Sequence, residues 1–211
     1  DKQAFIFINK FGNYCTLTAR DVYTLAGRFA TRLRQCGFVS GDVIANGVPN
    51  SPEKVVTDFG AVMAGCISLN CQIIDKDGGD FWNTANVSKC KGVIFPDKSA
   101  SPAYQLFSQF VSNNNHGISG CQDVSIPAAP LLTKAFIISR SQTRFDEIPA
   151  DDYNNFESNT NDVYDRHTDG IKDTASAQNC NYGEFLSNLS KSHEDIFVAE
   201  CSPDEDVYVF T

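Results

Sequence analysis

The chain has eight cysteines, whose thiols could bind zinc or form cross-links. No two cysteines form a C-x-x-C pair, and the three histidines are scattered. Zinc sites usually show closely spaced pairs of ligands, so the spacing does not favour zinc. We expect reduced thiols in the core or at the surface of an intracellular protein. The eight are Cys15, Cys36, Cys66, Cys71, Cys90, Cys121, Cys180 and Cys201.

Acidic residues in one stretch have part of the spacing of a calcium-binding loop. The stretch contains Asp165, Asp169, Gly170 and Asp173. The twelfth position, which should be a bidentate glutamate, is Ser176, and His167 stands where an oxygen ligand belongs. We therefore expect no calcium site and interpret the stretch as a solvated loop.

The common catalytic motifs are absent. The sequence has no G-x-G-x-x-G, G-x-x-x-x-G-K-[ST], G-x-S-x-G or H-E-x-x-H. No carboxylate pair stands out from the acidic background. We therefore assign no catalytic residue.

Charge is unevenly distributed along the 211 residues, whose formal net charge is −9. Residues 1–140 hold 13 Lys and Arg against 10 Asp and Glu, and residues 141–211 hold 4 against 16. An acidic C-terminal region argues against a nucleic-acid partner. No apolar run approaches the roughly 20 residues of a membrane-spanning helix, so no transmembrane segment is expected.

Residues 1–140 predict an α/β fold. Expected strands at 5–8, 43–48, 66–71, 92–95 and 135–138 alternate with expected helices at 18–37, 52–65, 77–87 and 102–111. The loops are short and the strands are apolar on both faces, which is typical of a mostly parallel sheet covered by helices. We interpret 1–140 as one α/β subdomain.

The first two helices have clear sequence signals at their ends. Thr18 and Asp21 can form a capping box, and Gly37 can end the first helix. In the second helix Ser51 can cap, with Pro52 at the first helical position. The expected apolar face of this helix consists of Val55, Val56, Phe59, Val62 and Met63. The arginines of the first helix, Arg20, Arg28, Arg32 and Arg34, are expected on a solvated face.

The remainder divides into two segments. Residues 141–180 are rich in Asp, Asn, Ser and Thr and lack apolar periodicity, so we expect an exposed insertion, mostly loop. Residues 181–211 predict a helix at 182–189 and a terminal strand at 207–210.

An ordered set of segments resembles the N-terminal part of adenylate-forming enzymes. It begins with L-T-A-R-D-V at 17–22 and continues with G-D-V-I at 41–44 and P-N-S-P-E at 49–53. Ala64-Gly65 and Ser68-Leu69-Asn70 follow. Next come K-G-V-I-F-P at 91–96 and P-D-E-D-V at 203–207. The Phe-Pro ending of the 91–96 segment is similar to that of medium-chain fatty acyl-CoA synthetases.

This resemblance implies an ATP-dependent activity. The family converts a fatty acid, ATP and coenzyme A to acyl-CoA, AMP and pyrophosphate through an acyl-adenylate, with Mg²⁺ neutralising the phosphates. Thr211 would begin the family's phosphate loop, which makes it a nucleotide-binding residue, and the catalytic groups would lie beyond it. The segment is therefore expected to be inactive by itself and to bind no cofactor alone. A mitochondrial or cytoplasmic location fits the resemblance.

Departures from the family pattern leave other interpretations open. Two residues fewer than usual separate Gly65 from Asn70, and Cys71 stands where the family commonly has proline. The 141–180 insertion is also long and acidic. An amino-acid-activating or luciferase-like branch, or a non-catalytic α/β binding module, are the alternatives.

Overall fold

A computed structural model describes residues 2–8, 14–74, 77–97, 101–111, 120–138, 184–200 and 209–210. A six-stranded sheet in the order β6-β7-β5-β3-β4-β8 forms its centre. The strands are β3 (Val43–Asn46), β4 (Ile67–Asn70), β5 (Cys90–Pro96), β6 (Cys121–Asp123), β7 (Lys134–Ile138) and β8 (Val209–Phe210). All neighbours pair in parallel except β6 and β7. The predicted mixed α/β fold with a mostly parallel sheet is confirmed.

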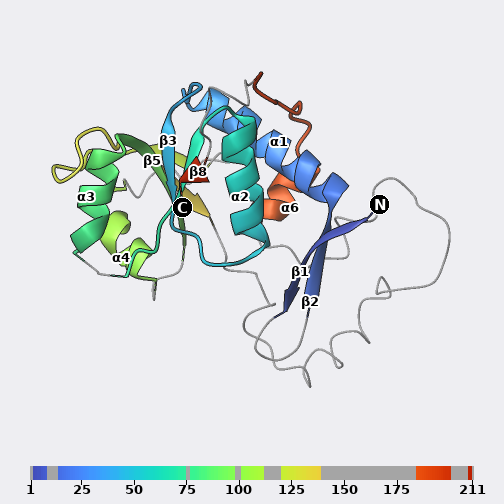
Figure 1. Ribbon diagram of the computed structural model, residues 1–211, viewed down its shortest axis with the longest axis horizontal. Coiled ribbons are helices and arrows are strands. Elements are labelled where there is room, and N and C mark those ends of the chain that lie inside the picture. The colour runs from blue at the N-terminus through green and yellow to red at the C-terminus, as the bar shows by residue number, and fades with distance from the viewer. Residues whose placement is uncertain are drawn as a thin grey trace.

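Helices cover both faces of the sheet (Figure 1). One face packs on α1 (Ala19–Gln35), α2 (Pro52–Met63) and α6 (Glu184–Lys191), and the other packs on α3 (Gly79–Val87) and α4 (Pro102–Phe107). Successive side chains of a strand enter opposite cores, as the pleat requires. Ile94 lies in the first core, and its neighbours Val93 and Phe95 lie in the second.

The first helix begins and ends where its sequence predicts. The Thr18 side chain accepts from the Asp21 backbone N–H at 3.1 Å, and Asp21 accepts from the Thr18 backbone N–H at 2.9 Å. Gly37 follows the helix with φ +85°, a left-handed value that favours glycine. An antiparallel hairpin of β1 (Gln3–Ile8) and β2 (Tyr14–Thr18) precedes the helix.

The second helix begins as predicted but buries a partly different face. Ser51 accepts a hydrogen bond from the Lys54 backbone N–H at 3.2 Å, and Pro52 is the first helical residue. Phe59, however, is 46% exposed and contacts Phe5 of the hairpin edge-on. The buried face instead centres on Val56, Thr57, Gly60 and Ala61. The predicted face is confirmed for Val56, with Val55 and Met63 packed beside the core, and is wrong for Phe59. The helix α1 approaches α2 closely at Gly60, where the absence of a side chain permits that approach.

The sheet also contains a strand that the sequence did not predict. β6 pairs antiparallel with β7, opposite Lys134 to Phe136. It lies at the edge of the sheet and has one apolar residue in three, Cys121, so it lacks a strand pattern of its own. The expected helix at 102–111 is shorter than predicted, because it ends as a 3₁₀ turn, η1 (Ser108–Phe110).

Two arginines of α1, Arg28 and Arg32, contact residues 189–194, which corrects the expectation of a solvated face for these two; Arg20 and Arg34 are exposed. Arg28 donates to the carbonyl oxygens of Leu189 and Ser190, both at 2.8 Å. These carbonyls lie in the last turn of α6, where a cation is favourable. Arg32 is 3% exposed and forms an ion pair with Glu194 at 2.9 Å. None of the described helices is long and apolar enough to cross a membrane.

Substitution of Gly60 tests the contact between α1 and α2. A Cβ at this position would lie 2.6 Å from Cδ1 of Phe29 and 2.9 Å from the Ala26 carbonyl oxygen. We expect Gly60→Ala to lower the free energy of unfolding by about 1–3 kcal/mol through overpacking. An unhindered helix interior would instead gain about 1 kcal/mol from this change. Urea denaturation measures the difference.

The contact with Phe29 can be separated from other effects of the alanine. Combining Gly60→Ala with Phe29→Leu should cost less than the sum of the two single changes, because the smaller side chain makes room. Strict additivity, or a stabilising Gly60→Ala, would show that the helices do not approach as described.

A second substitution tests the ion pair between Arg32 of α1 and Glu194. Arg32→Ala removes a charged donor from Glu194, so the free energy of unfolding should fall by about 2 kcal/mol. Gln35→Ala, an exposed change on the same helix, should remain within about 0.5 kcal/mol of the unaltered protein. Indistinguishable denaturation midpoints for the two variants would contradict this ion pair.

Candidate functional site at the carboxyl ends of β3, β4 and β5

A cavity of about 780 Å³ lies at the carboxyl edge of the sheet. Three segments line it, one after each of β3, β4 and β5: residues 47–50, residues 70–74 and residues 101–103. From β3 the chain passes through α2 to β4, which adjoins β3 on the side away from β5. From β5 the chain continues to β7, which adjoins β5 on the side away from β3. β3 and β5 therefore flank a topological switch point, where open α/β sheets bind their ligands.

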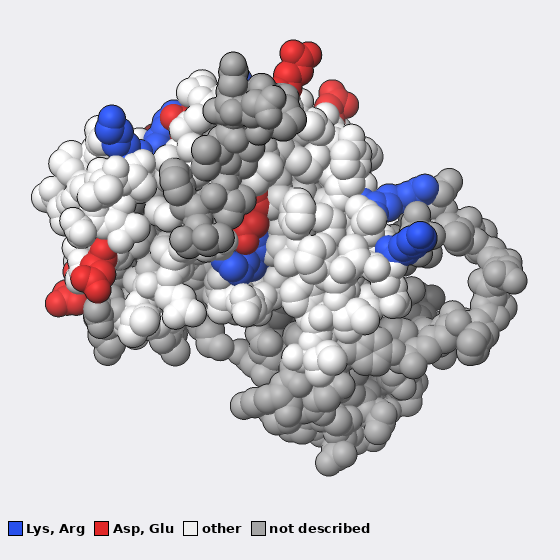
Figure 2. Space-filling model, in the orientation of Figure 1, with Lys and Arg blue, Asp and Glu red and all other residues white. Residues whose placement is uncertain are grey.

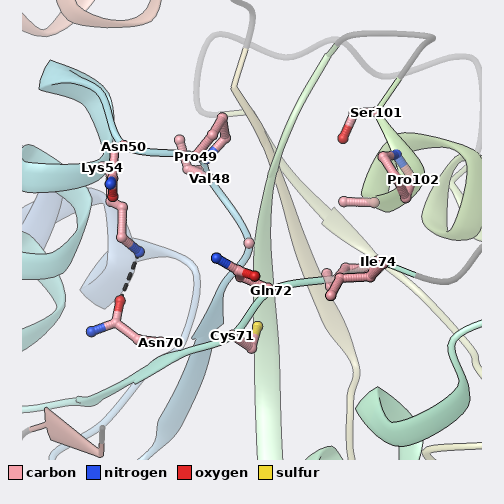
Figure 3. Close-up of a pocket in the computed structure, with 13 residues that line it drawn as sticks. Val48, Pro49, Asn50, Lys54, Asn70, Cys71, Gln72, Ile74, Ser101 and Pro102 are labelled. Carbon is pink, nitrogen blue, oxygen red and sulfur yellow. Dashed lines mark hydrogen bonds between the residues drawn. The ribbon is translucent and has the colours of Figure 1, made fainter.

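The cavity has polar and apolar walls. Figure 3 shows Lys54 and Asn70 on one side, Ser101, Pro102 and Ile74 on the opposite side, and Gln72 between them. Val48, Ile73 and Ala103 add apolar surface. Lys54 is the one charged residue among the described lining residues. Such a cavity suits an organic ligand with an apolar body and a polar or anionic group.

A buried polar network holds the wall of the cavity. Asn46, the last residue of β3, is fully buried. Its amide nitrogen donates to Thr57 Oγ1 at 2.9 Å and to Asp58 Oδ1 at 2.8 Å. Its amide oxygen accepts from the Val48 backbone N–H at 3.1 Å. One side chain thus fixes the first turn after β3 to α2.

The same network extends to β4 and Lys54. Ser68 donates to Asp58 Oδ1 at 2.6 Å. Lys54 Nζ lies 2.7 Å from Asn70 Oδ1 and 3.5 Å from Asp58 Oδ2. The ammonium group is thereby positioned at the cavity wall and partly balanced by Asp58.

The thiol at the cavity is unreactive. Burial, followed by repulsion from Cys90, raises the pKa of Cys71 to about 12. At neutral pH the side chain is therefore a neutral thiol, whereas the thiolate is the nucleophile. Cys71 contributes surface to the cavity rather than chemistry.

The structure brings several residues of the predicted motifs together. Asn50, Asn70 and Cys71 all line the cavity. Glu53 lies in the first turn of α2 and is fully buried, with no hydrogen-bond partner for its oxygens among the described residues. A helix N-terminus favours an acidic side chain. Thr211, the predicted nucleotide-binding residue, lies outside the described residues, so its role stays a prediction.

Sequence reasoning missed most of the lining residues, including the polar side chains of Lys54, Gln72 and Ser101. Lys54 and Gln72 carry no recognisable motif, but each lies within a few residues after a buried strand or at the start of the following helix. In a parallel sheet such positions meet at one edge. That rule, applied to every strand end, would have indicated them.

The described residues bring no three His, Cys, Asp or Glu side chains into a group that could hold a metal ion. The segment with part of a calcium-loop spacing, 165–176, lies outside them. On the face shown in Figure 2, the described charged side chains are scattered between wide uncharged areas. The large acidic excess of the sequence belongs mostly to residues that the structure does not describe.

Together the sheet and the cavity define an open α/β protein with a crevice at its topological switch point. The model of the AMP-binding enzyme family matches residues 1–104. No curated protein matches the sequence significantly.

Solved acyl-CoA synthetase structures share the fold. The acyl-CoA synthetase of Brucella canis superposes with a TM-score of 0.58 at 13% identity, over 99% of this chain and 28% of that one. A long-chain-fatty-acid-CoA ligase of Archaeoglobus fulgidus gives 0.55 at 11% identity, over 99% and 30%. The chain thus spans less than a third of either structure. The predicted likeness to the N-terminal part of adenylate-forming enzymes is confirmed at the level of the fold.

The contribution of the three Asn46 hydrogen bonds to stability can be tested directly. Asn46→Ala removes three hydrogen bonds and leaves Asp58 and the Val48 N–H without this partner, so the free energy of unfolding should fall by about 2–3 kcal/mol. Asn50→Ala, an exposed asparagine at the same cavity, should change it by less than about 0.5 kcal/mol. Chemical denaturation compares the two, and equal losses would rule out this contribution.

Proposed function

We propose that this chain forms the N-terminal α/β part of an ATP-dependent acyl-CoA synthetase. The observation that carries the proposal is the cavity at the switch point, whose segments 47–50, 70–74 and 101–103 all lie within the part that matches the AMP-binding family. The reaction joins a carboxylic acid to the thiol of coenzyme A through an acyl-adenylate. When bound, ATP supplies the adenylyl group that activates the acid.

The cavity is suited to the acyl substrate. Its apolar surface, formed by Val48, Ile73, Ile74 and Pro102, can exclude water from a hydrocarbon body. Lys54 on the opposite wall can attract a carboxylate, although Asp58 balances part of its charge. Medium-chain fatty acids are the proposed substrates, because strand β5 ends in the Phe95-Pro96 pair typical of the enzymes that act on them.

None of the described residues is proposed to carry out the chemical steps. The chain's own contribution is to bind and orient the acyl group. Mg²⁺ remains an expectation from the family resemblance, since the described residues do not assemble ligands for it. Thr211, which follows β8 in the sequence, is the proposed first contact to the nucleotide. A reducing compartment, mitochondrial or cytoplasmic, is proposed because the described cysteines are free.

The first test uses the protein expressed from the complete reading frame that contains these residues. With ATP, Mg²⁺ and coenzyme A, fatty acids of medium length should yield AMP and acyl-CoA. Failure to form AMP with any fatty acid would overturn the proposal. AMP formed only with amino acids would indicate another adenylate-forming branch. The codons after Thr211 give an independent check, because S-G-[ST]-T-G should follow.

Narrowing the cavity should weaken use of the acyl substrate. Ser101→Phe places a large side chain on the cavity wall, so KM for the fatty acid should rise about tenfold, the equivalent of roughly 1.4 kcal/mol. Ser125→Phe, an exposed change away from the cavity, serves as the matched control. An unchanged KM in both variants would show that the acyl group binds elsewhere.

The 211-residue chain alone should make no acyl-CoA. In the family, the rest of the phosphate loop and the catalytic lysine follow the position of Thr211. Incubation of the purified chain with ATP, coenzyme A and a fatty acid, followed by chromatography, checks this. Any thioester formed at enzymatic rates would place the catalytic groups within these residues.

A further inference from the structure

Two cysteines far apart in the sequence meet beside the core under α1. Cys36 follows the last residue of α1, and Cys121 begins β6. The two thiols lie close enough for each to shift the pKa of the other. Both side chains are partly exposed and pack against the same hydrophobic core.

The fold explains why these thiols are adjacent. Phe38, two residues after Cys36, contacts Phe136 of β7 with ring centroids 5.8 Å apart. Phe136 is the partner of Cys121 in the antiparallel register of β6 and β7. Packing of the two rings therefore places the end of α1 next to the start of β6.

The surroundings activate one thiol of the pair. Interaction with the Cys121 thiol lowers the pKa of Cys36; burial opposes this effect, Lys134 and Arg32 add to it, and Asp123 opposes it. The same interaction and burial raise the pKa of Cys121.

Three other described thiols, those of Cys66, Cys71 and Cys90, differ from Cys36. Burial raises the pKa of Cys66 to about 12 and that of Cys90 to about 11. Cys71 behaves likewise, and these three side chains therefore have almost no thiolate at neutral pH. A nucleophilic thiolate with a second thiol beside it is the arrangement of a redox-sensitive pair.

We propose that Cys36 and Cys121 are a redox-sensitive dithiol that closes to an intramolecular disulfide in the presence of a small disulfide such as oxidised glutathione. The Cys36 thiolate attacks one sulfur of glutathione disulfide, breaks its S–S bond and releases one glutathione thiolate. The Cys121 thiol then gives up its proton, attacks the Cys36 sulfur and expels the second glutathione. Two protein thiols are oxidised, one glutathione disulfide is reduced to two thiols, and the two protons pass to these.

The disulfide would link α1 to the edge of the sheet. β6 is three residues long and pairs with β7 alone among the described strands. A covalent link to the end of α1 constrains this strand and the unfolded chain, so oxidation should raise the melting temperature by about 5 °C. The cavity lies at the carboxyl ends of other strands, so the link is independent of the proposed acyl-CoA chemistry.

The experiment maps the bond in the native protein. The chain is treated with oxidised glutathione, remaining thiols are alkylated, and the protease digest is analysed by mass spectrometry. The expected dominant product is a pair of peptides joined through Cys36 and Cys121. Its mass should be two hydrogens below the sum of the two reduced peptides. Stable glutathione adducts without closure, or links mainly to Cys180 or Cys201, would overturn the proposal.

Variants and kinetics test the roles of the two thiols. Cys36→Ser and Cys121→Ser should each abolish the linked product, whereas Cys66→Ser should leave it unchanged. Circular dichroism checks that each variant is folded. If a variant is not folded, the disulfide mapping of the unaltered protein by itself tests the proposal.

Alkylation kinetics give an independent measurement. Iodoacetamide should modify Cys36 at least about tenfold faster than Cys66 at pH 7.5, because the lowered pKa of Cys36 leaves more thiolate at that pH. The advantage should shrink as pH rises toward the higher pKa of Cys66. Equal rates for the two thiols at pH 7.5 would refute the activation of Cys36.

Discussion

The buried amide of Asn46 is the constraint on which the cavity edge of this protein depends. It ends the central strand, and its partners belong to α2 and to the turn that follows β3. A buried amide must satisfy its donors and acceptor, so the positions of these groups are tightly specified. Asp58 in turn accepts from Ser68 of β4. The polar network thus fixes the register of a helix over two strands where apolar packing alone would permit sliding.

Local signals made the helices predictable, whereas the order of the strands depends on distant contacts. The capping box of Thr18 and Asp21 and the glycine at 37 define α1 within one stretch of sequence. Alternation of strands and helices indicates a parallel sheet, but it does not specify that β3 lies between β4 and β5. β6 depends on β7 for its pairing and has too few apolar residues to signal a strand.

The candidate site was predictable in part for the same reason. Its motif residue Asn50 follows β3 and Asn70 ends β4, and the apolar pattern reveals both strands. Lys54, in contrast, is placed by a hydrogen bond to Asn70 across the gap between α2 and β4. Likewise, a helical pattern puts Arg32 opposite the apolar face of α1. Only the tertiary structure supplies Glu194 to bury it. The sequence alone does not tell whether a polar residue on a helix surface is exposed or buried, because that depends on the segment that packs against it.

The contacts that residues 194–199 make with α1 and α2 affect how the protein folds during synthesis. After α6, the chain donates backbone hydrogen bonds from Phe197 to the Gly27 carbonyl and from Ala199 to the Met63 carbonyl. Arg32 meets its partner 162 residues later in the chain. A ribosome releases the N-terminus first, so the surface of α1 and α2 stays uncovered until residues 189–199 have been synthesised. Such non-local closure slows folding.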